Sequence, residues 1–378
     1  MTFIACSASM SNRNILILAN DTTYTYNLRI EIIEQLIDEG YHVTIASKCL
    51  FFIDELKEVG CDVLDVDAGR RGTNPINDSI LLITYIRIIH KRKPDVVLTF
   101  NIKPNVYGGI ACQLMRKRYI PNITGLGTSL EFLGRMQRLT IALYRIGIHG
   151  SQCVFFQNND NKQFFIDHKM LSNKHQCIVL PGSGVNLDKF KPLPYPNGDE
   201  IDYLFVGRIL KEKGIDLYIE AAKKIRKEYP LTKFHICGYC DDSSYIKIIG
   251  QAVKAGYVIY HGEQKDMRPF YEMAHCIVHP SYYPEGMSNV LLEAAACARP
   301  VITTYRSGCK EIVDNGQSGY TIKVNDVYSL VNLIKLFISH DNEKQCYMGL
   351  EGRKKVAREY DKKIVIRQYI DIIATKID

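Results

Sequence analysis

The 378 residues are too many for one hydrophobic core of ordinary size, so the length predicts two domains. An apolar share of 46% and a charged share of 24% are typical of a folded globular protein. No window approaches the roughly 18 uninterrupted apolar residues of a membrane-spanning helix, and the N-terminus lacks the basic and apolar segments of a secretory signal. We therefore expect a cytoplasmic protein whose membrane contact is peripheral.

The net charge of +7 is unevenly distributed along the chain. Residues 80–150 hold eleven Lys and Arg residues against two acids, Asp95 and Glu131. Such a basic stretch favours anionic lipid, diphosphates or nucleic acid as a partner. The eleven cations are Arg87, Lys91, Arg92, Lys93, Lys103, Arg116, Lys117, Arg118, Arg135, Arg138 and Arg145.

Most of the twelve cysteines lie inside apolar runs, where cysteine acts as a small hydrophobic residue. Cys237 and Cys240 form a C-x-x-C pair, but no second Cys or His pair stands at zinc-ligand spacing. We therefore expect reduced thiols and no metal.

The first half alternates short apolar runs with stretches of helical periodicity. Residues 27–40 (NLRIEIIEQLIDEG) carry apolar residues at helical spacing and end at Gly40, a helix-stop residue. Strands that alternate with helices are typical of βαβ units in a parallel sheet covered on both faces. The predicted strands are 14–19, 41–47, 61–67, 94–100, 120–125 and 153–158.

A proline- and glycine-rich segment, 181–200, interrupts this pattern and is the predicted linker. A long amphipathic helix at 360–376 follows the second half and can pack back onto the first domain. The predicted fold is α/β, with two Rossmann-like domains, 13–185 and 186–360, that face each other across a cleft and a C-terminal helix at 361–378. The strands predicted in the second half are 202–207, 233–238, 257–262, 276–280, 300–304 and 319–323.

The segment 279–304 (HPSYYPEGMSNVLLEAAACARPVITT) predicts a strand, a loop and a helix that begins near 286–288. Free amides and the helix dipole at such a start suit a diphosphate, and the carboxylates of Glu285 and Glu293 suit sugar hydroxyls. Solvated glutamates on a capped helix are the alternative, but an unpaired Glu293 inside VLLEAAA would be costly. The donor-binding residues expected here are Glu285, Gly286, Met287, Ser288, Asn289, Val290 and Glu293.

The segment FVGRILKEKGID (205–216) predicts a strand that ends at Gly207 and a strand-to-helix turn that carries Arg208 and Lys213. Arg can bind phosphate oxygens with two hydrogen bonds, and Lys adds a point charge. Surface charges at a helix start are the alternative, which is weakened because cations normally favour helix C-termini.

These two motifs, G-R-x-x-x-x-K-G at 207–214 and Glu-x7-Glu at 285–293, resemble those of the family-4 retaining glycosyltransferases. The resemblance implies that the two predicted domains have the GT-B arrangement. The resemblance implies that Gly207, Arg208 and Lys213 hold the donor diphosphate, that Glu293 binds the nucleotide ribose and that Glu285 positions the donor sugar. It further implies a same-face displacement that needs no protein nucleophile, no cofactor and no metal, with Arg208, Lys213 and Glu285 as the catalytic residues.

The first half resembles the subgroup that extends lipid-diphosphate-linked sugars. This implies a UDP-activated N-acetylhexosamine or related donor, and an undecaprenyl-diphosphate-linked acceptor in the assembly of a surface glycan such as O-antigen, capsule or a glycoprotein glycan. The segments that carry this likeness are NLR (27–29), KPNVYGGIA (103–111), TGLGTSLEF (124–132), VFFQN (154–158) and LPGSGVN (180–186).

The acceptor side departs from the family pattern, because the loop NITGLGTSLE lacks the histidine that many members have near the reacting sugar. Residues 124–128 line that position instead. Arg29 either meets the acceptor's phosphate or is a solvated helix charge. The expected acceptor residues are Asn27, Arg29, Thr124 and Thr128.

Residues 129–148 combine apolar residues with Arg135, Arg138 and Arg145, which predicts a basic amphipathic helix. It binds an anionic membrane at the inner face of the plasma membrane, or it is a core-facing helix with a solvated arginine face. No aromatic-rich RNA motif accompanies it, so we expect no nucleic-acid partner.

Two further patterns carry no site. The D-x-D at Asp65 and Asp67 fits alternation within a strand, and Gly125 and Gly127 lack the third glycine of a dinucleotide fingerprint. The alternatives to lipid-linked transfer are a soluble acceptor such as a sugar phosphate, a GT-B sugar-nucleotide epimerase, and a non-catalytic nucleotide-sugar-binding protein.

Overall fold

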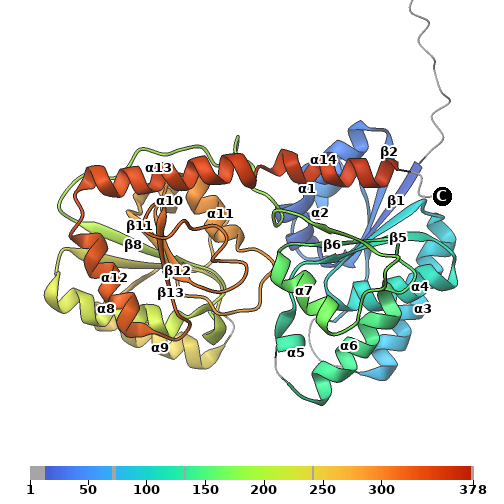
Figure 1. The fold of residues 1–378 in the computed structure, drawn as a ribbon, viewed down its shortest axis with the longest axis horizontal. Coiled ribbons are helices and arrows are strands. Elements are labelled where there is room, and N and C mark those ends of the chain that lie inside the picture. The colour runs from blue at the N-terminus through green and yellow to red at the C-terminus, as the bar shows by residue number, and fades with distance from the viewer. Residues whose placement is uncertain (1–12, 70–73, 132, 241, 376–378) are drawn as a thin grey trace, which may run out of the picture. The chain divides into compact units, whose positions relative to one another are not determined.

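The computed structural model describes residues 13–69, 74–131, 133–240 and 242–375. The N-terminal residues 1–12, Phe132 of the TGLGTSLEF segment and residues 376–378 of the predicted C-terminal helix lie outside this description. The chain forms two compact units: residues 1–183 together with 365–378, and residues 184–364. Each unit contains one parallel sheet with helices on both faces (Figure 1).

The first unit is built on a seven-stranded parallel sheet with the order β3-β2-β1-β4-β5-β6-β7. Six strands match the predicted apolar runs. The seventh, β7, was not predicted: it is an edge strand of four residues, only partly buried, and its apolar run over residues 177–180 is short and leads directly into the predicted linker. The strands are β1 (Arg13–Asp21), β2 (Tyr41–Lys48), β3 (Asp62–Asp65), β4 (Val96–Phe100), β5 (Arg118–Ile123), β6 (Cys153–Phe156) and β7 (Gln176–Val179).

Alternating side chains of β1 enter the two cores of this unit. Ile15 and Ile17 pack with α1 and α14 on one face of the sheet, and Leu16 and Leu18 pack with α3 and α4 on the other. Figure 1 shows this division, with α1 and α14 across the sheet from α3, α4 and α6. The helices are α1 (Thr22–Asp38), α2 (Ile53–Glu58), α3 (Pro75–Arg92), the π-helix η1 (Pro104–Gly108), α4 (Gly109–Leu114), α5 (Gly127–Glu131), α6 (Arg135–Ile148), α7 (Asn159–Asp167) and α14 (Lys362–Ala374).

Two helix predictions in the first unit need correction. The helix predicted at 27–40 begins five residues earlier, at Thr22, because Asp21 caps it by accepting a hydrogen bond from the Tyr24 amide. The single helix predicted over 129–148 is two helices, α5 and α6. They are separated at Gly134, whose backbone is extended and cannot continue a helix.

The second unit contains a six-stranded parallel sheet with the order β10-β9-β8-β11-β12-β13, and all six strands lie in the predicted runs. One core packs beneath α8, α9 and α12, and another beneath α10 and α11. The strands are β8 (Ile201–Val206), β9 (Thr232–Cys237), β10 (Ile259–Tyr260), β11 (Cys276–His279), β12 (Val301–Thr304) and β13 (Gly319–Ile322). The helices are the 3-10 turn η2 (Lys211–Lys213), α8 (Ile215–Glu228), α9 (Ser243–Lys254), α10 (Arg268–Met273), α11 (Asn289–Ala296), α12 (Val327–Ile338) and α13 (Asn342–Glu359).

Candidate functional site

The turn after β8 carries the G-R-x-x-x-x-K-G motif and lies against the end of β11. Gly214, which ends this turn, has a φ of +79°, and a Cβ atom there would stand 2.2 Å from the Pro280 carbonyl oxygen. Only glycine permits both this left-handed backbone and this close approach. The turn is also tied to the next loop by a 2.8 Å hydrogen bond from the Tyr282 amide to the Glu212 carbonyl.

This approach brings three predicted residues together. Lys213 forms an ion pair and hydrogen bond with Glu285, and both side chains are only 13% exposed. The Tyr283 ring lies beside both cations: the Arg208 guanidinium carbon is 5.9 Å and the Lys213 ammonium nitrogen is 5.4 Å from its centroid. One cluster at the carboxyl ends of β8 and β11 therefore contains Arg208, Lys213 and Glu285, although Glu285 is distant from the other two in the sequence.

A fully buried histidine, His279, lies at the end of β11 near this cluster. Burial lowers its pKa to about 4, and the Lys213 charge lowers it further while Glu285 opposes the shift. His279 is therefore neutral at physiological pH and adds no third cation. No role for His279 could be predicted from the sequence, because its burial and its neighbours depend on strand pairing.

Helix α11 begins later than predicted. Its first residue is Asn289 and Ser288 is the N-cap residue, whereas the sequence placed the start near 286–288. The Ser288 amide already donates a 2.7 Å hydrogen bond to the Gly308 carbonyl. The sequence predicted unpaired amides at this helix start. The amide of Ser288 is instead bound by the loop after β12, a contact that the motif alone does not show.

Glu293 lies on α11, and its partner is Tyr271 of α10. The Tyr271 hydroxyl donates to Glu293 Oε2 at 2.9 Å. Burial raises the pKa of Glu293 to about 7, although the hydrogen bond from Tyr271 and the charges of Lys189 and Lys362 lower it. The carboxyl is therefore neither a solvated charge nor an unpaired one, and its ionisation falls in the physiological range.

Arg299 fixes the helix that carries Tyr271. Its side chain is fully buried and donates to backbone carbonyls of α10 and of the linker, including Tyr271 (2.6 Å) and Glu272 (3.3 Å). A buried guanidinium with carbonyl partners on two segments holds both in place. Arg299 therefore acts on the site through Tyr271, a role that the sequence did not suggest.

The predicted acceptor residues occupy different surroundings in the first unit. Asn27 is exposed on α1, whereas Arg29 is only 6% exposed, so the solvated-charge interpretation of Arg29 is wrong. Thr124, after β5, accepts a 3.4 Å hydrogen bond from Asn101, and Thr128 is exposed on α5. Within the described chain, no hydrogen bond joins any two of the four residues.

The predicted membrane residues Arg135, Arg138 and Arg145 are exposed on α6. Exposed apolar side chains lie on the same helix and just before it, while Ile141, Tyr144 and Ile148 of the helix are buried in the core. Arg145 also donates a 2.6 Å hydrogen bond to the His168 carbonyl. None of the described helices is long and apolar enough to cross a bilayer. The exposed apolar residues are Leu133, Met136, Leu139 and Ile146.

Over the residues that the structure describes, no group of three or more His, Cys, Asp and Glu side chains is placed to hold a metal. Asp65 of the D-x-D accepts a hydrogen bond from the Cys49 amide, and Asp67 pairs with Lys48 at 2.8 Å. Both carboxylates therefore have partners at the end of β2.

Two Rossmann-like parallel-sheet units, with paired cations after the first strand of the second, define a glycosyltransferase of GT-B architecture. The sequence model of the Glycosyl transferases group 1 family matches residues 188–355, and that of the Glycosyl transferase 4-like family matches residues 14–158. Each model matches one of the two units, and the chain is a glycosyltransferase and a hexosyltransferase.

Its relatives include a transferase named for a diphospho-undecaprenol-linked sugar and one named for capsular polysaccharide biosynthesis. It is 23% identical over 365 residues to the N,N'-diacetylbacillosaminyl-diphospho-undecaprenol alpha-1,3-N-acetylgalactosaminyltransferase of Campylobacter jejuni, covering 92% of this chain and 94% of that protein. It is 25% identical to the capsular polysaccharide biosynthesis glycosyltransferase CapM of Staphylococcus aureus, covering 82% and 84%. The crystal structure of HepE from Anabaena with UDP and glucose superposes with a TM-score of 0.80 at 17% identity, covering 96% of this chain and 100% of HepE.

Proposed function

We propose that this glycosyltransferase moves an N-acetylhexosamine or related sugar from a UDP-sugar to a polyprenyl-diphosphate-linked saccharide, with retention of configuration, during assembly of a surface glycan. The Lys213–Glu285 ion pair beside Arg208 carries the proposal, because it places a cation that can hold phosphate next to a carboxylate that can hold sugar. The relatives' diphospho-undecaprenol acceptor and capsular pathway support the acceptor class.

Arg208 and Lys213 bind the donor diphosphate, together with the amides of Met287, Asn289 and Val290 at the start of α11. The diphosphate competes with Glu285 for Lys213, which frees the Glu285 carboxylate to accept hydrogen bonds from the sugar. Glu293, when ionised, accepts hydrogen bonds from the ribose hydroxyls. Gly207 and Gly286 allow the backbone to approach the ligand.

In the transfer step, the bond between the sugar's anomeric carbon and the diphosphate oxygen breaks, and the acceptor hydroxyl oxygen bonds to that carbon on the same face. The acceptor's proton passes to the departing diphosphate. The two cations stabilise the negative charge that develops on this leaving group, so we propose that neither a metal nor a protein nucleophile is required.

We further propose that the first unit docks peripherally on an anionic membrane, the inner face of the plasma membrane, through α6. Its exposed arginines suit anionic headgroups and its exposed apolar side chains suit the interface. Helix α3 extends this surface: it contacts η1 and α4 as α6 does, and it exposes Ile76, Ile80 and Ile83.

A panel of UDP-sugars, incubated with a synthetic polyprenyl-diphosphate-linked sugar, tests the function. We expect one donor to be transferred by the wild type, and Arg208→Ala and Glu293→Ala to abolish transfer while the fold is kept. Wild-type turnover by both variants would remove the assigned site. Transfer to a sugar phosphate alone, or conversion of the UDP-sugar without an acceptor, would instead favour a soluble acceptor or an epimerase.

Co-sedimentation with anionic liposomes tests the membrane proposal. Neutralising Arg135, Arg138 and Arg145 to Gln removes about 1 kcal/mol of attraction per charge, so binding should fall about a hundredfold. The matched control neutralises three exposed lysines of the second unit, Lys223, Lys227 and Lys254, and should bind as the wild type does. Equal loss in both variants would mean that α6 has no specific part.

A further inference from the structure

Arg29 is a buried cation in the first unit, and the carboxylate of Asp21 acts on it electrostatically. Its guanidinium stacks on the Phe100 ring at 3.9 Å from the centroid and donates one hydrogen bond, of 3.1 Å, to the Tyr24 carbonyl. Burial lowers the pKa of Arg29 to about 10, so it is still charged at neutral pH. No carboxylate in the described part of the chain forms an ion pair with it. Burying a charge is costly unless it is paired, so this arrangement calls for a partner.

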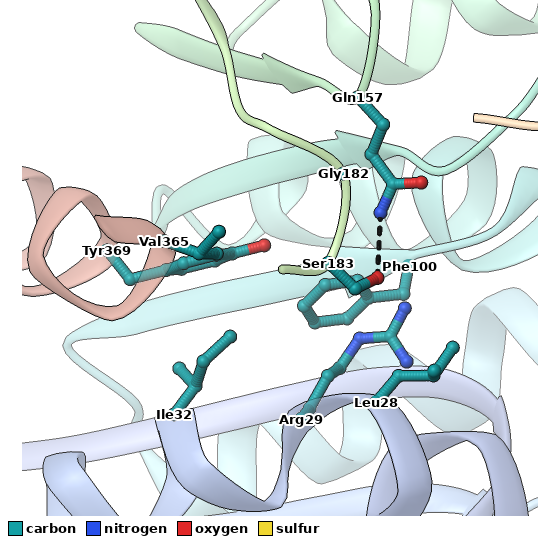
Figure 2. Close-up of a pocket in the computed structure, with 9 residues that line it drawn as sticks. All are labelled: Leu28, Arg29, Ile32, Phe100, Gln157, Gly182, Ser183, Val365 and Tyr369. Carbon is teal, nitrogen blue, oxygen red and sulfur yellow. Dashed lines mark hydrogen bonds between the residues drawn. The ribbon is translucent and has the colours of Figure 1, made fainter. Parts of the chain in front are cut away.

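The guanidinium is directed into a small pocket at the carboxyl edge of the first sheet, as Figure 2 shows. The pocket is small and partly open to solvent, so a whole sugar does not fit inside it. Its walls come from α1, the ends of β4, β6 and β7, and α14. The lining residues are Leu28, Arg29, Ile32, Phe100, Gln157, Gly182, Ser183, Val365 and Tyr369.

Two polar groups of this pocket can still donate a hydrogen bond, the Arg29 guanidinium and the Ser183 hydroxyl. Gln157 Nε2 donates to Ser183 Oγ at 3.1 Å, so the Ser183 hydroxyl hydrogen is left to donate elsewhere (Figure 2). The Tyr369 hydroxyl already donates to Asn122. No lining residue is acidic. A buried guanidinium beside a hydroxyl donor, with apolar walls and no carboxylate, selects an oxyanion.

Three of the five segments that resemble the lipid-diphosphate subgroup meet in this pocket. NLR supplies Leu28 and Arg29, VFFQN supplies Gln157, and LPGSGVN supplies Gly182 and Ser183. Gly182 has a φ of +62°, which turns the chain so that Ser183 enters the lining. Segments some 150 residues apart in the sequence thus build one donor-lined cavity.

We infer that this pocket binds a phosphate group of the acceptor, with Arg29 and Ser183 as its ligands. The shared chemistry is a phosphate oxyanion, from a lipid diphosphate or from a soluble phosphate. The existence of an anion site is inferred from the pocket alone. The identity of the phosphate that it binds rests on the proposed function.

Calorimetric titration of the full chain with pyrophosphate, in the presence of saturating UDP to occupy the donor site, tests the anion site without any transfer reaction. We expect saturable binding by the wild type, about tenfold weaker binding by Ser183→Ala, and at least about a hundredfold weaker binding by Arg29→Met. Arg13→Met is the matched control, because Arg13 also lies over a ring, that of Tyr41 at 5.8 Å, but is exposed at the other end of β1. It should bind as the wild type does.

Two calorimetric results would overturn the inference: no saturable binding by the wild type, or unchanged binding by Ser183→Ala. Ser183→Ala decides the case even if Arg29→Met fails to fold, because it removes only one hydroxyl group.

Acceptor kinetics identify the source of the phosphate. If it is the lipid diphosphate, Ser183→Ala raises the KM for a polyprenyl-diphosphate-linked sugar about tenfold, with the KM for the UDP-sugar unchanged, and sugar-free polyprenyl diphosphate displaces pyrophosphate. If it is a soluble phosphate, a sugar phosphate displaces pyrophosphate instead. If the wild type transfers sugar and Ser183→Ala leaves the KM for the acceptor unchanged, the pocket does not bind the acceptor phosphate, but the proposed function stands. If the wild type transfers no sugar, the proposed function is refuted and the calorimetric result still stands.

Discussion

Replacing Glu293 by Gln removes one charge from the proposed donor site and keeps its shape. The Gln side-chain oxygen can still accept the hydrogen bond that Tyr271 donates to Glu293. Burial raises the pKa of Glu293 from its ordinary 4.5 to about 7, so the folded chain holds this proton more tightly than the unfolded chain does. Between these pH values the folded state binds more protons, and the free energy of unfolding of the wild type therefore falls as pH rises.

The size of the effect follows from the pKa difference. At about 1.4 kcal/mol per pH unit, an ionised Glu293 costs the folded state up to about 3 kcal/mol above pH 7 and about 1 kcal/mol at pH 5. Partial solvent screening makes these figures upper limits. The neutral Gln carries no such cost, so the variant should gain stability over the wild type by about 2 kcal/mol between pH 5 and pH 8.

Urea unfolding followed by circular dichroism, at pH 5, 6, 7 and 8 without nucleotide, measures this gain. Glu272→Gln, at an exposed glutamate of α10, is the matched control and should show no pH-dependent difference. At pH 8 the more stable Glu293→Gln variant should bind UDP at least about tenfold more weakly, because a charged acceptor of ribose hydrogen bonds is lost. A pH-independent stability difference would refute the raised pKa, and wild-type UDP affinity would remove Glu293 from the nucleotide site.

Three further predictions concern the turn after β8 and the need for a metal. Lys213→Met should weaken UDP binding about tenfold to a hundredfold because it removes a charged phosphate ligand, whereas Lys211→Met, at an exposed neighbour, should leave calorimetric affinity unchanged. Gly214→Ala should destabilise the fold more than Gly256→Ala in thermal unfolding: both glycines have a left-handed φ, which costs about 1 kcal/mol for alanine, but only Gly214 faces a carbonyl at 2.2 Å. Equal destabilisation of the two variants would mean that the backbone around Pro280 moves away from the added Cβ atom at little cost. Transfer should persist in excess EDTA if Arg208 and Lys213 neutralise the diphosphate, and its loss with recovery on adding Mg²⁺ would contradict that role.

The sequence predicted the elements whose pattern is local. The central strands of both sheets are buried on two faces and appear as apolar runs, and the turn motif placed Arg208 and Lys213 at the carboxyl end of β8. It also indicated that Glu293 could not be left unpaired. The features it missed depend on packing between distant segments. Tyr271 lies 22 residues from the glutamate it contacts, and the Ser288 amide is engaged by a loop after the following strand.

The burial of Arg29 was not predicted for the same reason. An arginine in the third turn of a helix has no local signal that separates a solvated charge from a buried one. Its burial follows from the side of α1 that packs against β4 and α14, where Phe100 and Tyr369 lie. The split between α5 and α6 was likewise hidden, because apolar and basic residues continue on both sides of Gly134.

The anomeric configuration of the product is the most direct test of the proposed transfer. Proton NMR of the product from a UDP-N-acetylhexosamine and a polyprenyl-diphosphate-linked sugar gives the linkage and its configuration. We predict one added sugar with the configuration that it had in the donor. An inverted linkage, or a UDP-sugar that is converted without transfer, would contradict the proposal.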